Sequence, residues 1–541
     1  MVIGSAKRHL FRLIVPALSN FSIYSDIARY TTALGPICVA TAANKLKDWD
    51  VEVIDENNCR GKFCPKDRFG LPDHPRLQAE RPADAVGFYG SLSSTVPRIF
   101  ELAEFYKGLG VRTIAGGKHV ENLPEESLAN GIDVVVLGEG EETIKELLLN
   151  VPLENIKGIA FRRNGQMIKT EPRPLITDFE NQPIPDFNLI RYARISIYPV
   201  SRTRGCDMNC EFCAVKEKTR CATPEKMMSV VSHLAETRGA RKFFESSDHF
   251  AANREETMEF CRLLAEYQKR KGLKLKMTVQ IRLNDARYPE LLKAMKEAGI
   301  INVCIGYESP IDEELISMRK GYLSKDMINW TKIFHQYGFF IHGMFIFGYP
   351  RRNNNEPAVK ISLDEKVKRF KNFINRAKID TAQVLLTVPL VGTELRTRLE
   401  KEGRIFPLAD IGWQYYDGQF PLFMPDDGVT PEEMQNAVTK IMSNFYRFHH
   451  LLAIMIHIVV HFPIFVFPAA LTITTLKTRY ITRVYNWWEK KYFRNQSMRF
   501  GGWFIVRNWF KNFRKDNFLE KLNQAKAKLN QAKEKLSRPA N

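Results

Sequence analysis

The 541-residue chain contains only nine cysteines, and their number is odd. A secreted domain stapled by disulfides uses cysteine far more densely, so we expect a reducing compartment. Glycine (31) and proline (27) are not in excess, which excludes collagen-like and low-complexity chains. The first 20 residues lack the uncharged core of a signal peptide, because Arg12 interrupts their apolar run. With 44% hydrophobic and 26% charged residues, the composition predicts a folded protein of two to four domains.

Acidic residues are in deficit at one end of the chain. The formal net charge is +19, and residues 477–541 hold 17 basic but only 4 acidic side chains. The rest of the chain is therefore close to neutral. A basic segment of this kind predicts contact with an anionic surface.

Short β-branched runs alternate with helical patterns between residues 10 and 149, which is typical of a parallel sheet with helices on both faces. Three of the expected strands end in loops of small residues. Ligands bind at this carboxyl edge of an α/β sheet because glycine lets the backbone approach them, although such loops can also be simple tight turns. We expect an α/β domain over residues 1–150, with strands Leu10–Val15, Val51–Ile54, Ala85–Tyr89, Val111–Ala115 and Val134–Leu137.

A connector rich in proline, with one hairpin around Asn164-Gly165, is expected over residues 151–195. Strand and helix patterns alternate again over residues 196–430, which predicts part of a (β/α) TIM-type barrel. A helical region over residues 431–541 completes the expected α/β architecture. The strands expected in the barrel are Phe243–Glu245, Lys274–Gln280, Ile301–Ile305, Phe340–Phe347 and Ala382–Val388.

The strongest motif is a triplet of cysteines with C-x3-C-x2-C spacing, formed by Cys206, Cys210 and Cys213. Composition alone predicts far fewer than one such triplet in a chain of this length. Three thiolates hold a four-iron cluster and leave one iron open to another ligand. The alternatives are a zinc site that lacks a fourth ligand nearby, or buried free thiols.

With Phe212 before its last cysteine, the triplet resembles the signature of the radical S-adenosylmethionine (SAM) superfamily. The resemblance implies a [4Fe-4S] cluster on Cys206, Cys210 and Cys213, and a 5′-deoxyadenosyl radical made from SAM that takes a hydrogen atom from the substrate. It continues at Thr223-Pro224-Glu225, which is also a good start for a helix. The chain departs from the family pattern at Arg351-Arg352-Asn353, where Gly-Glu-Thr often follows the proline. The SAM-binding residues implied are Phe212, Glu245, Asp248, Glu308, Gly348 and Pro350.

Residues 10–150 resemble the cobalamin-binding domain, of flavodoxin-like or Rossmann-like fold, that precedes some radical SAM barrels. The chain lacks D-x-H-x-x-G, so we expect no histidine from that motif on cobalt. It also lacks G-x-G-x-x-G after the first strand, which argues against a nicotinamide cofactor. The resemblance implies a class that includes hopanoid methylases and anaerobic magnesium-protoporphyrin cyclases. The cobalamin-binding residues implied are Ser91, Ser93, Thr95, Gly116, Gly117, His119, Gly138 and Glu139.

Residues 451–476 contain no Asp, Glu, Lys or Arg and are long enough to cross a bilayer. One crossing would place the basic tail outside, against the bias that keeps Lys and Arg inside. We therefore favour a re-entrant or interfacial segment bent near Pro463 and Pro468 over a span. Aromatic residues interleave with basic ones in the tail, which suits the headgroups of an anionic membrane better than nucleic acid. The last two heptads, from Leu522, predict a solvated basic extension.

The sequence thus predicts a cytoplasmic enzyme, peripherally or monotopically bound to a membrane. It would methylate or cyclise a lipid or tetrapyrrole with electrons from a flavodoxin or ferredoxin. One alternative is an RNA-modifying methylthiotransferase-like enzyme, which requires a second cysteine set and an appended β-barrel that the sequence lacks. The other is a membrane scaffold with a vestigial barrel.

Overall fold

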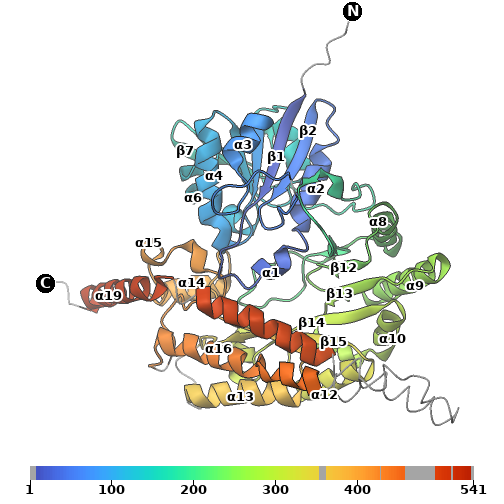
Figure 1. The fold of residues 1–541 in the computed structure, drawn as a ribbon. Coiled ribbons are helices and arrows are strands. Elements are labelled where there is room, and N and C mark those ends of the chain that lie inside the picture. The colour runs from blue at the N-terminus through green and yellow to red at the C-terminus, as the bar shows by residue number, and fades with distance from the viewer. Residues whose placement is uncertain are drawn as a thin grey trace, which may run out of the picture.

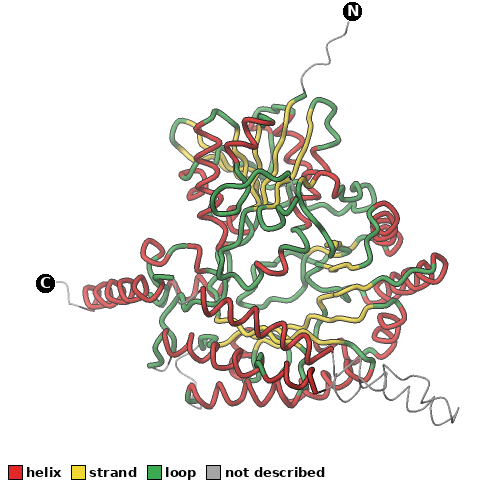
Figure 2. The backbone as a smooth tube through the Cα atoms, in the orientation of Figure 1, coloured by secondary structure: helices red, strands yellow, loops and turns green. Residues whose placement is uncertain are grey.

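A computed structural model describes residues 8–61, 63–352, 361–426, 428–456, 494–512 and 516–537. Two sheets form the frame, with the first sheet above the second in Figure 1 and helices over their outer faces. Figure 2 shows that loops gather in the space between the sheets. The active chemistry of such folds lies in the loops at strand ends, so this region is where a site is expected.

The first sheet has eight strands in the order β7-β6-β5-β4-β3-β1-β2-β8. The six neighbouring strands β5, β4, β3, β1, β2 and β8 run parallel to one another. At the other edge, β6 pairs antiparallel with β5, and β7 pairs antiparallel with β6. All five strands expected in this domain are confirmed within two residues. The strands are β1 (His9–Val15), β2 (Trp49–Asp55), β3 (Ala85–Tyr89), β4 (Arg112–Gly116), β5 (Val134–Val136), β6 (Ile159–Arg163), β7 (Gln166–Lys169) and β8 (Ile190–Arg191).

Alternate residues of β1 build two different cores. Phe11 and Leu13 belong to a core that contains residues of α2 and α7, while Leu10 and Ile14 belong to one that contains residues of α4. Period-two alternation in which both faces are apolar is what a sheet covered on both sides requires. The helices of this part are α1 (Ser25–Ala28), α2 (Leu34–Ala43), α3 (His74–Glu80), α4 (Val96–Gly108), α5 (Lys118–Asn122), α6 (Pro124–Ala129) and α7 (Glu141–Leu148).

The expected connector contributes strands to the first sheet. The hairpin around Asn164-Gly165 is present as β6 and β7, and β6 pairs with β5. Further along, β8 pairs with β2 at the opposite edge. Short strands of this kind carry little hydrophobic pattern, so their partners cannot be identified from the sequence.

The second sheet has six parallel strands in the order β16-β15-β14-β13-β12-β9. All five strands expected in this part are confirmed, and β9 is an additional first strand. Six parallel strands joined by helices form part of a (β/α) barrel. They are β9 (Tyr198–Val200), β12 (Lys242–Glu245), β13 (Lys276–Gln280), β14 (Ile300–Glu308), β15 (Phe340–Phe347) and β16 (Thr381–Leu386).

Helices cover the outer side of the second sheet (Figure 1). The predicted start of α8 is confirmed, because Thr223 caps the helix by accepting a hydrogen bond from the Lys226 backbone N–H. The helices between residues 224 and 445, of which α14 and α15 lie at the carboxyl edge and not on this side, are α8 (Pro224–Thr237), α9 (Arg254–Lys271), α10 (Pro289–Glu297), α11 (Asp312–Met318), α12 (Ser324–Gln336), α13 (Leu363–Arg376), α14 (Glu394–Lys401), α15 (Leu408–Ile411) and α16 (Pro431–Phe445).

Most of the described residues after 430 are helical, in α16, residues 449–456, residues 494–512 and α19 (Phe518–Ser537). The expectation of a solvated extension at the end of the chain is wrong for α19. Phe518 and Leu522 are buried in a core with Tyr415, and Lys526 pairs with Glu432 of α16 at 2.8 Å. The heptad spacing places these apolar side chains on one face, and that face packs against the loops after α14.

Most of the apolar segment 451–476 lies outside the described residues, as does the bend expected near Pro463 and Pro468. Among the helices in the described ranges, none combines the length and apolar character needed to cross a bilayer. Elsewhere, Cys59 and Cys64 are joined by a disulfide.

Arg12, which interrupts the apolar run of β1, is a fully buried charged residue and therefore needs partners for its guanidinium. Its guanidinium is 0% exposed and donates to Glu52 Oε1 at 2.7 Å, to Gln78 Oε1 at 2.9 Å and to the Arg81 carbonyl at 2.7 Å. These contacts hold β1, β2 and the end of α3 together. The pKa of Glu52 is lowered, because the arginine contacts outweigh the opposing effect of burial.

Replacing Arg12→Ala leaves the Glu52 carboxylate buried without its main partner. We expect the free energy of unfolding of the first domain to fall by about 3–5 kcal/mol, measured by urea denaturation. The control is Arg76→Ala, which removes an exposed ion pair with Glu80 and should leave the transition unchanged. Equal effects of the two substitutions would contradict the role assigned to Arg12.

Candidate functional site

The three cysteines of the triplet lie in one loop between two short antiparallel strands, β10 (Thr203–Arg204) and β11 (Arg220–Cys221). The neck of this cysteine loop, residues 205–219, is closed by a hydrogen bond from the Cys206 backbone N–H to the Glu217 carbonyl at 2.9 Å. Gly205 is required there, because its φ is +86° and a Cβ would lie 2.4 Å from the Lys218 carbonyl oxygen. The loop follows β9 and so begins at the carboxyl edge of the second sheet.

Positive groups surround the thiols. Arg282 Nη2 lies 3.3 Å from Cys206 Sγ, and Lys320 lies near Cys210. Burial raises the pKa of the Cys210 thiol, while the charges of Lys320 and Arg282 lower it. Three thiols in a loop with cationic neighbours suit the thiolate ligands of an iron–sulfur cluster. No group of three His, Cys, Asp or Glu side chains surrounds a single metal-ion position within the described ranges.

Glu211, inside the triplet, anchors the cysteine loop to the end of β15. Its carboxylate is buried and accepts hydrogen bonds from Tyr349 Oη at 2.7 Å, Arg398 Nε at 2.9 Å and Arg352 Nε at 3.2 Å. The pKa of Glu211 is lowered, since these donors outweigh the effect of burial. Arg352, at which the chain departs from the family pattern, therefore helps to hold the cysteine loop in place through Glu211.

This anchor brings together three of the predicted SAM-binding residues. The rings of Phe212 and Tyr349 meet edge to face with centroids 6.2 Å apart. Tyr349 stands between Gly348, whose φ is +74°, and Pro350, whose carbonyl accepts from Arg398 Nη2 at 3.1 Å. The residues Phe212, Gly348 and Pro350 thus share one corner beside the cysteine loop.

Glu245 ends β12 with one carboxylate oxygen in use and the other without a partner. Oε1 accepts from the Arg202 backbone N–H at 2.9 Å and from Ser247 Oγ. Oε2 is buried without a hydrogen-bond partner. Burial raises the pKa of Glu245 to about 6, although its hydrogen bonds lower it. A buried acceptor left unpaired fits the ammonium donor of a ligand such as SAM.

Asp248, the second predicted carboxylate of this segment, fixes the neck of the cysteine loop. Its Oδ2 accepts from the Gly205 backbone N–H at 3.0 Å. Burial raises the pKa of Asp248, and the Gly205 bond opposes the rise. Asp248 also lines the cavity described below.

Glu308 sits in a bulge at the end of β14 and has a φ of +61°. Its Oε1 accepts from Lys320 Nζ at 2.7 Å, and a Cβ on Gly306 would lie 2.3 Å from this oxygen. A strained backbone at a carboxylate that pairs with a half-buried lysine is typical of a functional position. Lys320 therefore links Glu308 to the region of Cys210.

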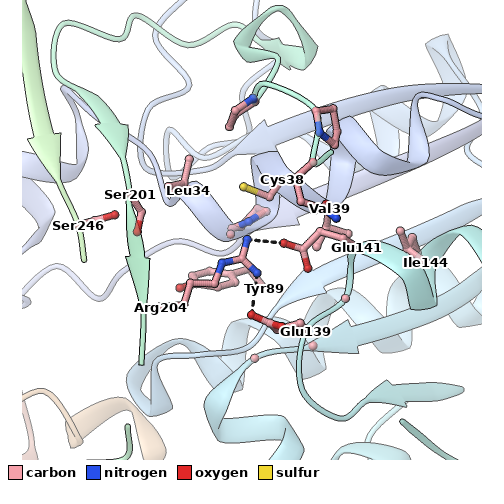
Figure 3. A pocket seen from close by; sticks show the side chains of 18 of the residues that line it. Leu34, Cys38, Val39, Tyr89, Glu139, Glu141, Ile144, Ser201, Arg204 and Ser246 are labelled. Atoms are coloured by element: carbon pink, nitrogen blue, oxygen red, sulfur yellow. Dashed lines mark hydrogen bonds and ion pairs between the residues drawn. The ribbon is translucent and has the colours of Figure 1, made fainter. Parts of the chain in front are cut away.

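A cavity of about 420 Å³ separates the carboxyl edges of the two sheets (Figure 3). The side from the first sheet is largely apolar, with Leu13, Val39 and Ile144 among its lining residues. The side from the second sheet carries Ser201, Arg204 and Ser246. An apolar slot that opens to a few polar groups fits a large, flat cofactor such as cobalamin.

The eight predicted cobalamin-binding residues divide into two groups. Gly116, Gly117, Gly138 and Glu139 line the cavity. The remaining four, Ser91, Ser93, Thr95 and His119, are not among its lining residues. His119 is buried, with Nδ1 2.9 Å from Ser93 Oγ and its ring edge to face with Trp413.

Several residues of the site gave no signal in the sequence. Arg204 and Glu141 meet in the cavity, and Glu211, Arg282 and Lys320 meet around the cysteine loop. Arg204 and Glu141 are 63 residues apart in the chain, and Arg282 and Cys206 are 76 residues apart. Arg202 and Arg204 precede the triplet, and Arg319 and Lys320 follow α11. In the sequence they are ordinary basic residues, and nothing identifies their partners.

The chain matches the radical SAM superfamily over residues 200–360 and the B12 binding domain over residues 27–148. It belongs to the radical SAM superfamily and carries a B12-binding domain ahead of the radical SAM domain. It is a cobalamin-dependent radical SAM enzyme of the methyltransferase or cyclase type, and its cofactors are a [4Fe-4S] cluster, SAM and cobalamin.

Two relatives agree with the class expected from the sequence. The hopanoid C-2 methylase of Rhodopseudomonas palustris is 23% identical, covering 71% of this chain and 67% of the relative. The anaerobic magnesium-protoporphyrin IX monomethyl ester cyclase of Cereibacter sphaeroides is 25% identical, covering 62% of this chain and 55% of the relative.

Among solved structures, the radical SAM methyltransferase TsrM from Kitasatospora setae, with cobalamin and a [4Fe-4S] cluster bound, has the same fold. Its TM-score is 0.60 at 15% identity, covering 80% of this chain and 88% of that one. The prediction of the superfamily and of the three cofactors is confirmed, and the hypothesis of a vestigial, non-catalytic barrel is wrong. The β-barrel that a methylthiotransferase-like enzyme requires is not found in the described residues after 430, which are mostly helical.

The free oxygen of Glu245 predicts a pH dependence of SAM binding. The negative charge that attracts an ammonium group is present only when Glu245 is deprotonated, and burial raises the pKa of Glu245 to about 6. We expect full affinity from about one pH unit above this pKa, and a loss approaching tenfold per pH unit from about one pH unit below it. Calorimetric titration of the reconstituted protein with SAM measures this.

The matched variant is Glu245→Gln, which keeps the shape of the side chain but not its charge. Its affinity should be lower at neutral pH and should no longer change near pH 6. If wild type and Glu245→Gln share one pH profile, Glu245 does not contact the SAM amino group.

Proposed function

We propose that this enzyme methylates a carbon atom of a hydrophobic substrate, either a polycyclic or isoprenoid lipid or a tetrapyrrole. The observation that carries methyl transfer is the cobalamin cavity, which lies between the two sheets and is lined by Arg204 at the base of the cysteine loop. The hopanoid methylase and the magnesium-protoporphyrin cyclase are named for substrates of this kind, which supports the same class here. Oxidative ring formation is the second reaction of this class.

Residues at the carboxyl edge of the second sheet would bind the cluster and SAM. Cys206, Cys210 and Cys213 would hold the cluster, and Glu245 and Glu308 would orient SAM. When bound, the cluster and SAM supply a radical that takes hydrogen from an unactivated carbon, and cobalamin supplies the methyl group. The apolar lining excludes water from the space between them, which protects reactive species from side reactions. A flavodoxin or ferredoxin would deliver the electrons.

The experiment uses full-length protein, reconstituted without oxygen with iron, sulfide and hydroxocobalamin. It is incubated with reductant and SAM that carries a trideuterated methyl group, together with either a membrane lipid and pigment extract or an aqueous metabolite extract. We expect the label to enter a compound of the lipid and pigment extract. Loss of two hydrogens from such a compound, without label, would indicate ring formation. Label confined to the aqueous extract would contradict a hydrophobic substrate.

Two cysteine variants control this reaction. Cys210→Ala removes a cluster ligand and should abolish both labelling and 5′-deoxyadenosine formation. Cys261→Ala removes a buried cysteine of α9 outside the triplet and should retain both. Retention of both activities by Cys210→Ala would overturn the cluster assignment.

We also propose that residues 448–456 and 494–512 rest on an anionic membrane, from which the substrate is taken. Six large apolar side chains on residues 448–456 and 494–512 are exposed, which is an unusual concentration for a surface that meets only water. Phe448 packs on Phe500 and Trp503, so the two segments lie together. Basic residues flank them and complement anionic headgroups. The exposed apolar residues are Phe448, Leu452, Met455, Ile456, Met498 and Phe504.

Leu452→Ser with Ile456→Ser should weaken binding to vesicles of phosphatidylglycerol and phosphatidylcholine by about tenfold, measured by co-sedimentation. The matched control is Leu109→Ser with Leu149→Ser. The exposed fractions are 57% and 55% for the first pair, against 55% and 61% for the control pair in the first domain. Equal binding of both double variants would contradict the membrane face.

A further inference from the structure

Four ion pairs join the first domain to the strands and loop that carry the cysteines. Arg204 Nη1 lies 2.8 Å from Glu139 Oε1, and Arg204 Nη2 lies 2.6 Å from Glu141 Oε1. Arg220 Nη1 lies 3.0 Å from Glu139 Oε2. A separate pair joins Lys118, at the start of α5, to Glu217 in the cysteine loop.

These ion pairs connect the base of the cysteine loop to the wall of the cobalamin cavity. Arg204 and Arg220 face each other in the register of β10 and β11, at the base of the cysteine loop. Glu139 and Glu141 lie on the turn before and at the start of α7, and both line the cobalamin cavity. Figure 3 shows Arg204 reaching across the cavity to both carboxylates. One arginine therefore touches the wall of one cofactor site and the base of the loop that carries another.

The electrostatics make this contact stronger than a surface ion pair. Glu141 is buried, and Glu139 and Arg220 are largely shielded from solvent. Burial raises the pKa of Glu139, but the bonds from Arg220 and Arg204 outweigh it and lower the pKa. The guanidinium fork of Arg204 engages two carboxylates at once, which fixes its orientation in a way that a single ammonium cannot. Phe179 lies against both arginines, with centroid distances of 5.4 Å and 5.9 Å.

We propose that Arg204, Glu139 and Glu141 form an interdomain clamp that couples occupancy of the cobalamin cavity to the position of the cysteine loop. A ligand that fixes Glu139 and Glu141 in the cavity wall also fixes Arg204, and with it the base of the loop where SAM binds. The loop then loses less conformational freedom when SAM arrives, so the two ligands bind with positive cooperativity. Because coupling is reciprocal, SAM must tighten cobalamin binding by the same factor. Arg204 acts as a positioning residue, and the proposal does not depend on which substrate is methylated.

The test measures coupling and not activity. The dissociation constant of SAM is determined by calorimetry on cluster-reconstituted full-length protein, with and without hydroxocobalamin. We expect cobalamin to tighten SAM binding by about 5–100-fold in wild type, and the ratio to fall to near one in Arg204→Gln. Arg204→Lys, which keeps the charge but loses the fork, should retain an intermediate ratio.

The matched control is Arg262→Gln. Arg262 also pairs with two glutamates, Glu259 and Glu266, but all three lie on the exposed face of α9. Its ratio should equal that of wild type. Glu141→Gln is the second variant of the clamp, and serves if Arg204→Gln does not fold. Its ratio should also fall to near one.

Two results would overturn the proposal. The first is a ratio near one in wild type. The second is a variant of the clamp that binds both ligands more weakly at an unchanged ratio, because this is the effect of a merely structural ion pair. The electron paramagnetic resonance signal of the reduced cluster gives a second readout. In wild type and in Arg262→Gln, cobalamin should lower the SAM concentration needed to change this signal. In Arg204→Gln it should not.

Discussion

Parallel strands end together, and this single geometric constraint organises the molecule. Both sheets present their carboxyl edges to the same space, so the loops of two domains meet around one cavity. Glycines allow the backbone to bend sharply where these loops meet, as at Gly117, with φ of +124°, and Gly205, with φ of +86°. The cysteine loop and the cobalamin cavity are neighbours for this reason, although residues far apart in the chain build them.

Buried carboxylates do different work according to their partners. Glu52 and Glu211 are surrounded by arginines and have a lowered pKa, so they act as fixed structural anions. Glu245 has few compensating charges and one free oxygen, so its pKa is raised and it remains available to a ligand. The same side chain thus holds the fold in one environment and offers a binding group in another.

The sequence predicted the strands well because their apolar runs are long and bounded by small residues, as at β3 and β15. It also predicted the three cysteines, whose spacing is rare. It could not predict that β6 and β8 extend the first sheet, since pairing between distant short strands leaves no local pattern. The same limit applies to Glu211 with Arg398 and to Arg204 with Glu141. Each of these partners is an ordinary charged residue until the fold brings it to the other. His119 follows the expected glycine-rich loop, but the sequence could not show that its ring packs against Trp413 and does not line the cavity.

The chemistry of this protein depends on a four-iron cluster held by Cys206, Cys210 and Cys213 beside a cobalamin cavity. Metal analysis of the full-length protein, reconstituted without oxygen and freed of unbound metal, is the decisive experiment. We expect about four iron atoms and about one cobalt atom per chain, with the iron lost and the cobalt retained when the three cysteines are replaced by alanine. Zinc in place of iron, or iron that remains bound after this replacement, would contradict it.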